Sequence, residues 1–137
     1  MKWRSHLPNN CPPNAAEIAS GEVYRFIDNE HEEPSPEDFL SWRELNPKAD
    51  CPTSLTECQA CGLSVIRSIE DVHKAPKKVP ALRKMKPALG ILTAELGRIQ
   101  NTPSNRCGQS HHTWWVANNT EPWKVFSIVE INSKAQS

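Results

Sequence analysis

The clearest alternation of hydrophobic and polar positions lies in residues 22–27, which predicts a β-strand with two distinct faces. On such a strand Val23, Arg25 and Ile27 share one face, and two aromatic residues share the other. Other segments rich in apolar or β-branched residues predict strands over residues 63–66, 88–93, 98–102, 113–116 and 123–131.

Short helices are predicted where a hydroxyl or amide residue is followed three positions later by an acidic one. Ser35 begins such a motif and predicts a helix over residues 36–45. A second motif predicts a helix over residues 69–74, which ends before Pro76 because proline lacks the backbone N–H of a helix interior. A third predicts a turn or two over residues 15–19.

These elements do not alternate regularly, which indicates the α+β class: one compact domain with a mixed or mainly antiparallel sheet and two or three short helices. A length of 137 residues fits one domain. We expect residues 1–21 to be an irregular leader packed on a domain formed by residues 22–137.

The net charge of the whole chain indicates no class of binding partner, because sixteen acidic and sixteen basic residues cancel. Residues 74–86, however, carry six basic residues and no acidic one. This run is either a solvated face or a patch that binds phosphate or nucleic acid, and both interpretations stay open.

No apolar run approaches the ~20 residues of a membrane span, and residues 1–6 lack the apolar core of a signal peptide. We therefore expect a cytoplasmic protein with no membrane contact, whose five cysteines are reduced.

The cysteines suggest a metal site. Cys58 and Cys61 are separated by two residues and followed by glycine, a spacing that turns both thiolates toward one zinc ion. Cys107, together with His111 or His112, would supply the remaining ligands. The alternative is that these thiols are small, partly buried side chains.

Residues 110–116 bring together two adjacent histidines and two adjacent tryptophans. On a strand, His111 and Trp115 point to one face, and His112 and Trp114 to the other. Only one histidine–tryptophan pair can then line a pocket, where the histidine would act as an acid or base and the tryptophan would stack on a base or nicotinamide.

Arg25 lies between two apolar neighbours on its strand face, so its guanidinium needs an anionic or hydrogen-bonding partner in the protein or in a ligand. A pyrophosphate would fit that requirement. The alternative is an edge position from which the head group reaches water.

The order of these pieces resembles the small ADP-ribosyltransferase-like toxin and effector domains. The resemblance rests on residues 23–25, 38–41, 62–65, 110–116 and 123–129. It implies that Arg25 on the first strand and Ser64 on a central strand hold NAD. The family's glutamate before the final hairpin is replaced here by His111 and His112, which puts transferase activity in doubt.

The resulting hypothesis is a small ADP-ribosyltransferase-like domain that binds NAD or a related nucleotide or phosphate ligand, in a toxin or defence effector. Its catalytic candidates are Arg25, His111 and His112, and its cofactor-binding candidates are Arg25, Ser64, Trp114 and Trp115. Two alternatives stay open: a zinc-stabilised module that binds a protein partner, and an accessory protein that binds RNA or DNA through residues 74–86. The sequence contains no P-loop, G-x-G-x-x-G, G-x-S-x-G or H-E-x-x-H motif, so conventional ATPases, Rossmann oxidoreductases, serine hydrolases and zinc proteases are unsupported.

Overall fold

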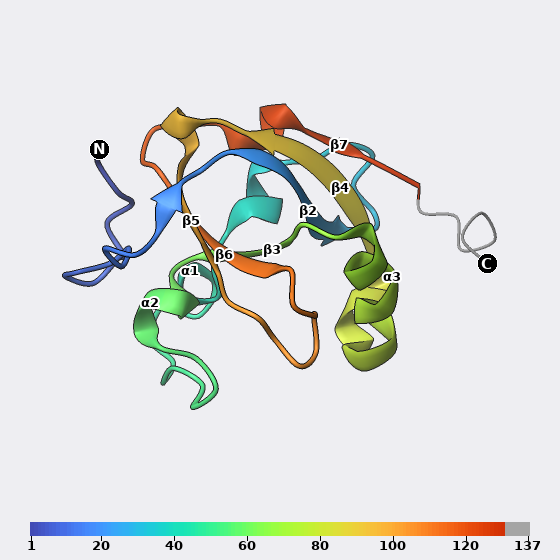
Figure 1. Ribbon diagram of the computed structural model, residues 1–137, viewed down its shortest axis with the longest axis horizontal. Helices are drawn as coiled ribbons and strands as arrows, with labels where there is room; N and C mark the ends of the chain where they lie inside the picture. Colours follow the sequence, from blue (N-terminus) through green and yellow to red (C-terminus); the bar gives the residue numbers. More distant parts are fainter. Residues whose placement is uncertain (131–137) are drawn as a thin grey trace.

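The computed structural model describes residues 1–130. In this range seven strands form one antiparallel sheet in the order β1-β5-β6-β3-β2-β4-β7, with short helices beside it (Figure 1). The strands are β1 Glu17–Ile18, β2 Gly21–Asp28, β3 Leu63–Ile66, β4 Met85–Leu92, β5 Gly97–Asn101, β6 His111–Val116 and β7 Phe126–Ile128. The helices are α1 Trp42–Leu45, α2 Glu57–Ala60 and α3 Ile69–Lys78, and the 3-10 turns are η1 Pro36–Phe39, η2 Pro80–Lys84, η3 Ala94–Leu96 and η4 Pro122–Val125. The predicted α+β class is confirmed.

The sheet is strongly curled around an aromatic core. In a flat sheet, β6 and β7 would lie roughly 19 Å apart, because neighbouring strands are about 4.8 Å apart and three strands separate them. Yet the rings of Trp114 on β6 and Phe126 on β7 stack with their centroids 5.9 Å apart. Phe39 of η1 closes this core, 6.3 Å from Trp114 and 4.9 Å from Phe126.

Pairing along the sheet is weakest between β2 and β3. Among the described residues these strands pair only at Tyr24 and Ile66, whereas β2 pairs with β4 along its whole length and β3 does the same with β6. The sheet therefore consists of two well-paired parts, β1-β5-β6-β3 and β2-β4-β7. We call the boundary between β2 and β3 the seam.

Two predicted helices differ from the structure. The helix predicted over residues 36–45 is divided into η1 and α1, because Ser41 forms a new cap in which its hydroxyl accepts a hydrogen bond from Glu44 N. Helix α3 continues through Pro76, and its last turn is closed by a hydrogen bond from Val79 N to Ala75 O at 2.8 Å. A proline so close to the end of a helix breaks little of the hydrogen-bond ladder.

A predicted helical turn and a predicted strand also need correction. Residues 15–19 do not form a helical turn, because Glu17 and Ile18 pair with the free edge of β5. The strand predicted over residues 123–131 is limited to β7 after the turn η4, and its last predicted residue lies outside the described range.

The N-terminal leader is fastened to the rest of the chain. Trp3 pairs with Ala117 beyond the end of β6, and Cys11 forms a disulfide with Cys58. Cys11 also packs in a small apolar cluster around the fully buried Trp115. The expectation that all five cysteines are reduced is therefore wrong for Cys11 and Cys58.

We predict that the double variant Cys11→Ser/Cys58→Ser unfolds more easily than the native chain. The disulfide joins residues 47 positions apart, and closing a loop of this length stabilises a protein by about 4 kcal/mol in the chain-entropy estimate. Urea denaturation of the two proteins measures the difference. Cys51→Ser, at a free cysteine, is the control and should change little; a double variant as stable as the native chain would contradict the prediction.

Candidate functional site

Ser64 is the residue at which the sequence-predicted site comes together. It lies on β3, and its side chain is exposed between buried neighbours. Its carbonyl oxygen accepts a hydrogen bond from Nη1 of Arg25 at 2.9 Å, and its hydroxyl contacts Nε2 of His111. Three residues selected from separate parts of the sequence thus form one contiguous cluster, which we call the Ser64 cluster.

Arg25 reaches this cluster across the seam. Val23 and Ile27, which share its strand face, are fully buried in the core, and the partly buried side chain of Arg25 lies on that same face. There Nε donates to the carbonyl of Asp38 at 2.7 Å, and the guanidinium lies 5.7 Å from the centroid of the Phe39 ring. The head group therefore fills the place where backbone pairing between the two strands ends.

The positive charge of Arg25 has neutral partners. Burial lowers the pKa of Arg25 to about 10, an effect that the charge of Asp38 opposes, so the side chain stays protonated at neutral pH. The carboxylate of Asp38 is itself occupied, 2.8 Å from Nδ1 of His31 and 2.9 Å from the backbone nitrogen of Ser35. No ion pair to Arg25 occurs within residues 1–130. The cation is thus held by carbonyl oxygens and an aromatic ring.

His111 is held in one tautomer. Its Nδ1 lies 2.7 Å from the carbonyl oxygen of Thr102, which can only accept, so Nδ1 carries the hydrogen. In the neutral ring Nε2 is then the acceptor, and it faces the hydroxyl of Ser64. Burial lowers the pKa of His111, the nearby His112 acts in the same direction, and the hydrogen bond to Thr102 opposes both. The imidazole is therefore mainly neutral at pH 7.

His112 does not join the Ser64 cluster. It pairs with Val65 and so lies on the face of the sheet opposite to His111. Its Nδ1 is 2.7 Å from Ser110 O, and its Nε2 accepts a hydrogen bond from Arg67 Nε at 3.4 Å. Burial lowers the pKa of His112 as well. The structure thus shows which of the two histidines contacts Ser64, a choice that the sequence left open.

Neither tryptophan has an exposed ring. Trp114 and Trp115 are both 0% exposed, and their Nε1 atoms donate to Leu96 O at 3.0 Å and Cys58 O at 2.8 Å. A ring that is enclosed on all sides cannot stack on a ligand without rearrangement of the core. The expectation that one of them lines a pocket is corrected: both belong to the packing of the domain.

The cysteines expected to bind zinc are not brought together. Cys58 is bonded to Cys11, and burial raises the pKa of the Cys61 thiol to about 11, which disfavours the thiolate that zinc requires. Cys107 packs beside α3 in a different apolar cluster. Within the described part of the chain, no group of three or more His, Cys, Asp or Glu residues is arranged to hold a metal ion.

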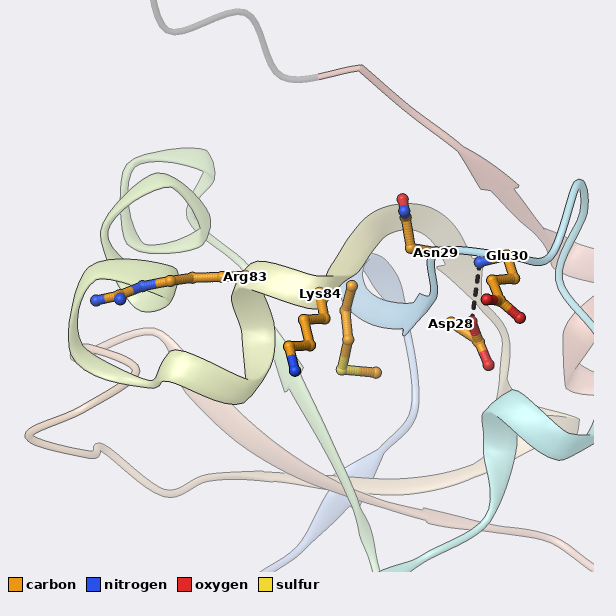
Figure 2. A pocket seen from close by; sticks show the side chains of 6 residues that line it. Asp28, Asn29, Glu30, Arg83 and Lys84 are labelled. Atoms are coloured by element: carbon orange, nitrogen blue, oxygen red, sulfur yellow. Dashed lines mark hydrogen bonds between the residues drawn. The ribbon is translucent and has the colours of Figure 1, made fainter.

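Two hollows on the surface lie apart from the Ser64 cluster. The first lies between the turn after β2 and the segment that joins η2 to β4 (Figure 2). In that view Arg83 extends away from Asp28 and Glu30, and the turn is closed by a hydrogen bond from Glu30 N to Asp28 Oδ1 at 2.9 Å. The second hollow, of about 360 Å³, is lined mainly by apolar residues of α3, η2 and β4 and by Phe26.

The basic segment 74–86 extends from α3 through η2 into β4. Five of its six cationic side chains are exposed, and Lys86 is partly buried. Arg83 donates to the carbonyls of Pro76 and Lys77, so part of this charge supports the local backbone. Binding of nucleic acid by this segment stays a prediction.

Comparison with protein-family models, with curated proteins and with solved structures finds no match to this chain. In the described residues, no helix combines the length and the apolar character that crossing a membrane requires.

The sequence did not indicate the groups that orient the Ser64 cluster. They are the backbone carbonyls of Asp38 and Thr102, and every residue has such a carbonyl. The contact between Ser64 and His111 follows from the register of β3 against β6, in which Ser64 pairs with Thr113. A single sequence does not specify that register.

We predict that acid destabilises the native chain through the partly buried His111 and His112. The folded-state pKa of each is below its unfolded value, so the stability that they contribute is complete above pH ~6.5 and is lost as the pH falls through the folded-state pKa. The double variant His111→Gln/His112→Gln should therefore lose less stability than the native chain between pH 7 and 5. Urea denaturation at each pH measures this difference, and equal losses in both proteins would contradict it.

Proposed function

We propose that the Ser64 cluster binds a nucleotide or another phosphate-bearing ligand, and that NAD is the first candidate. The observation that carries this proposal is the contact of one exposed serine with both a guanidinium and a neutral imidazole. Arg25 supplies a fixed positive charge, and His111 supplies a group that can accept or donate a proton. The two are held on different strands, and Arg25 contacts the carbonyl of Ser64 whereas His111 contacts its hydroxyl.

An anion is the ligand best suited to Arg25. Arg25 is partly buried, and its Nη1 reaches the carbonyl oxygen of the exposed residue Ser64. A guanidinium presents paired donors that match the oxygens of a phosphate. In a partly desolvated position its attraction for an anion is stronger than in water. Because the protein partners of Arg25 are neutral, a bound anion would add an attraction between opposite charges that the protein itself does not supply.

His111 would add acid–base chemistry at the same place. A neutral imidazole whose pKa lies near the working pH is an effective general base or acid. Its lone pair at Nε2 faces an exposed hydroxyl rather than the interior. A proton on the ligand or on Ser64 would therefore lie within its reach.

The ADP-ribosyltransferase-like resemblance supports NAD as the specific ligand. It implies that Arg25 and Ser64 hold the dinucleotide, and these two residues are in direct contact here. The position of the family's glutamate is held by a histidine pair, of which His111 contacts Ser64. A neutral imidazole has no negative charge with which to stabilise a cationic ribose, so we propose ligand binding with acid–base chemistry rather than the family's full transfer reaction.

Titration calorimetry of the native chain with NAD, ADP-ribose and ADP tests this proposal. We expect at least one of the three to bind. Arg25→Lys should weaken that binding about 10- to 100-fold, because it keeps the charge but removes the paired donors of a charge-assisted interaction worth roughly 1.5–3 kcal/mol.

Arg83→Lys is the matched control for this measurement. Arg83 also donates to backbone carbonyls but lies on η2, away from the Ser64 cluster. Its replacement should leave the affinity unchanged. If none of the three compounds binds the native chain, or if both lysine variants weaken binding equally, the proposed site is wrong.

A further inference from the structure

We infer that Ser64 is a catalytic nucleophile that attacks the phosphorus of a phosphoric ester or anhydride, with His111 as its general base. The choice of phosphorus as the electrophile rests on the phosphate-bearing ligand proposed above. The nucleophile itself rests on the geometry of the cluster, in which hydroxyl, imidazole and backbone carbonyl form a chain of hydrogen bonds.

The carbonyl of Thr102 determines which atoms donate in this series of hydrogen bonds. Because the carbonyl of Thr102 can only accept, the hydrogen of the neutral His111 ring is on Nδ1, and Nε2 must accept from the Ser64 hydroxyl. A nucleophile within reach of a base that is itself oriented by a third group is the arrangement of nucleophilic catalysis. Here a backbone carbonyl takes the orienting role that a carboxylate has in the Ser-His-Asp triad.

The base is also held rigidly. The backbone oxygen of His111 accepts hydrogen bonds from Thr102 N at 2.9 Å and from Asn101 Nδ2 at 3.0 Å. The hydroxyl of Thr102 makes two more contacts: it lies 3.0 Å from Nδ1 of His111 and 2.9 Å from the hydroxyl of Thr113. Both the strand and the ring of His111 are thus fixed against the end of β5, so the orientation of Nε2 does not depend on a bound ligand.

Ser64 differs from an ordinary buried serine–histidine pair because its side chain is exposed. Its hydroxyl donates toward Nε2, which leaves the oxygen lone pairs free to face a ligand.

The proposed step balances without a further reactant. A bond forms between Oγ of Ser64 and phosphorus while the bond from phosphorus to the leaving oxygen breaks. The Ser64 proton passes to Nε2 of His111, while the leaving oxygen, in line with Oγ on the other side of phosphorus, takes a proton from solvent. Water then attacks phosphorus from that other side and loses a proton to solvent, the bond between phosphorus and Oγ breaks, and Nε2 returns its proton to Oγ, so that the overall reaction is hydrolysis of the ester or anhydride.

Reaction of the full chain with an alkyl fluorophosphonate tests the inference. Attack by Ser64 would form an Oγ–phosphorus bond and release fluoride, with the proton lost through His111 to solvent. We expect one adduct per chain in the intact mass spectrum, and peptide mapping should place it on Ser64. His111→Gln should slow labelling by about 10²- to 10⁴-fold, which is the usual contribution of a positioned general base.

Two serine variants serve as the comparison. Ser64→Ala should abolish labelling, whereas Ser127→Ala should leave it unchanged, because Ser127 is also exposed on a strand but has no histidine partner in the described structure. Circular dichroism shows whether each variant is folded. The labelling rate should also rise with pH through the pKa of His111, which lies below its ordinary value because the ring is partly buried.

The inference is overturned if the native chain is not labelled, if the adduct lies on another residue, or if His111→Gln is labelled at the native rate. These outcomes are distinct from failure of the proposed function. If Ser64 is labelled in a chain that binds none of the three nucleotides, Ser64 is a nucleophile but the proposed nucleotide binding is wrong. If a nucleotide binds but Ser64 is not labelled, the binding site is supported and the nucleophilic role of Ser64 is wrong.

Discussion

The central constraint in this structure is the need to stabilise one guanidinium at a place where the sheet stops pairing. A cation that is partly withdrawn from water is costly unless its donors are satisfied. Arg25 meets that requirement with the carbonyls of Asp38 and Ser64 and with the ring of Phe39. These groups come from two elements, η1 and β3, so satisfying one charge fixes both of them relative to β2. The aromatic core then closes around Phe39.

The same constraint determines what is accessible near Ser64. On the side away from the seam, β3 pairs with β6 along its whole length. That register places Thr113 opposite Ser64 and brings the ring of His111 to the serine hydroxyl. His112 and Trp114, one residue further along in each case, are directed to the opposite face. A single strand thus contributes both to the cluster and to the core, and strand alternation decides which residue does which.

The sequence predicted the parts of the molecule that depend on local pattern. Alternation in residues 22–27 and the cap at Ser35 both correspond to elements of the structure, and alternation in residues 111–116 correctly separated the two histidines. What it missed depends on long-range geometry. The curl of the sheet encloses Trp114, the register joins Ser64 to His111, and the disulfide from Cys11 removes Cys58 from any metal site. Backbone carbonyls, which orient the cluster, leave no trace in a sequence.

The seam has a mechanical consequence. Arg25 belongs to one well-paired part of the sheet, and Ser64 and His111 belong to the other. Beside the cluster they are joined by one residue pair, by the hydrogen bond of Arg25 to Ser64 O and, directly after β3, by a hydrogen bond from Arg67 Nη1 to Glu22 O. A ligand that contacted both Arg25 and His111 would therefore link the two parts of the sheet across this boundary. Part of its binding energy would become cohesion between the two halves of the sheet, and the domain would stiffen along its least supported line.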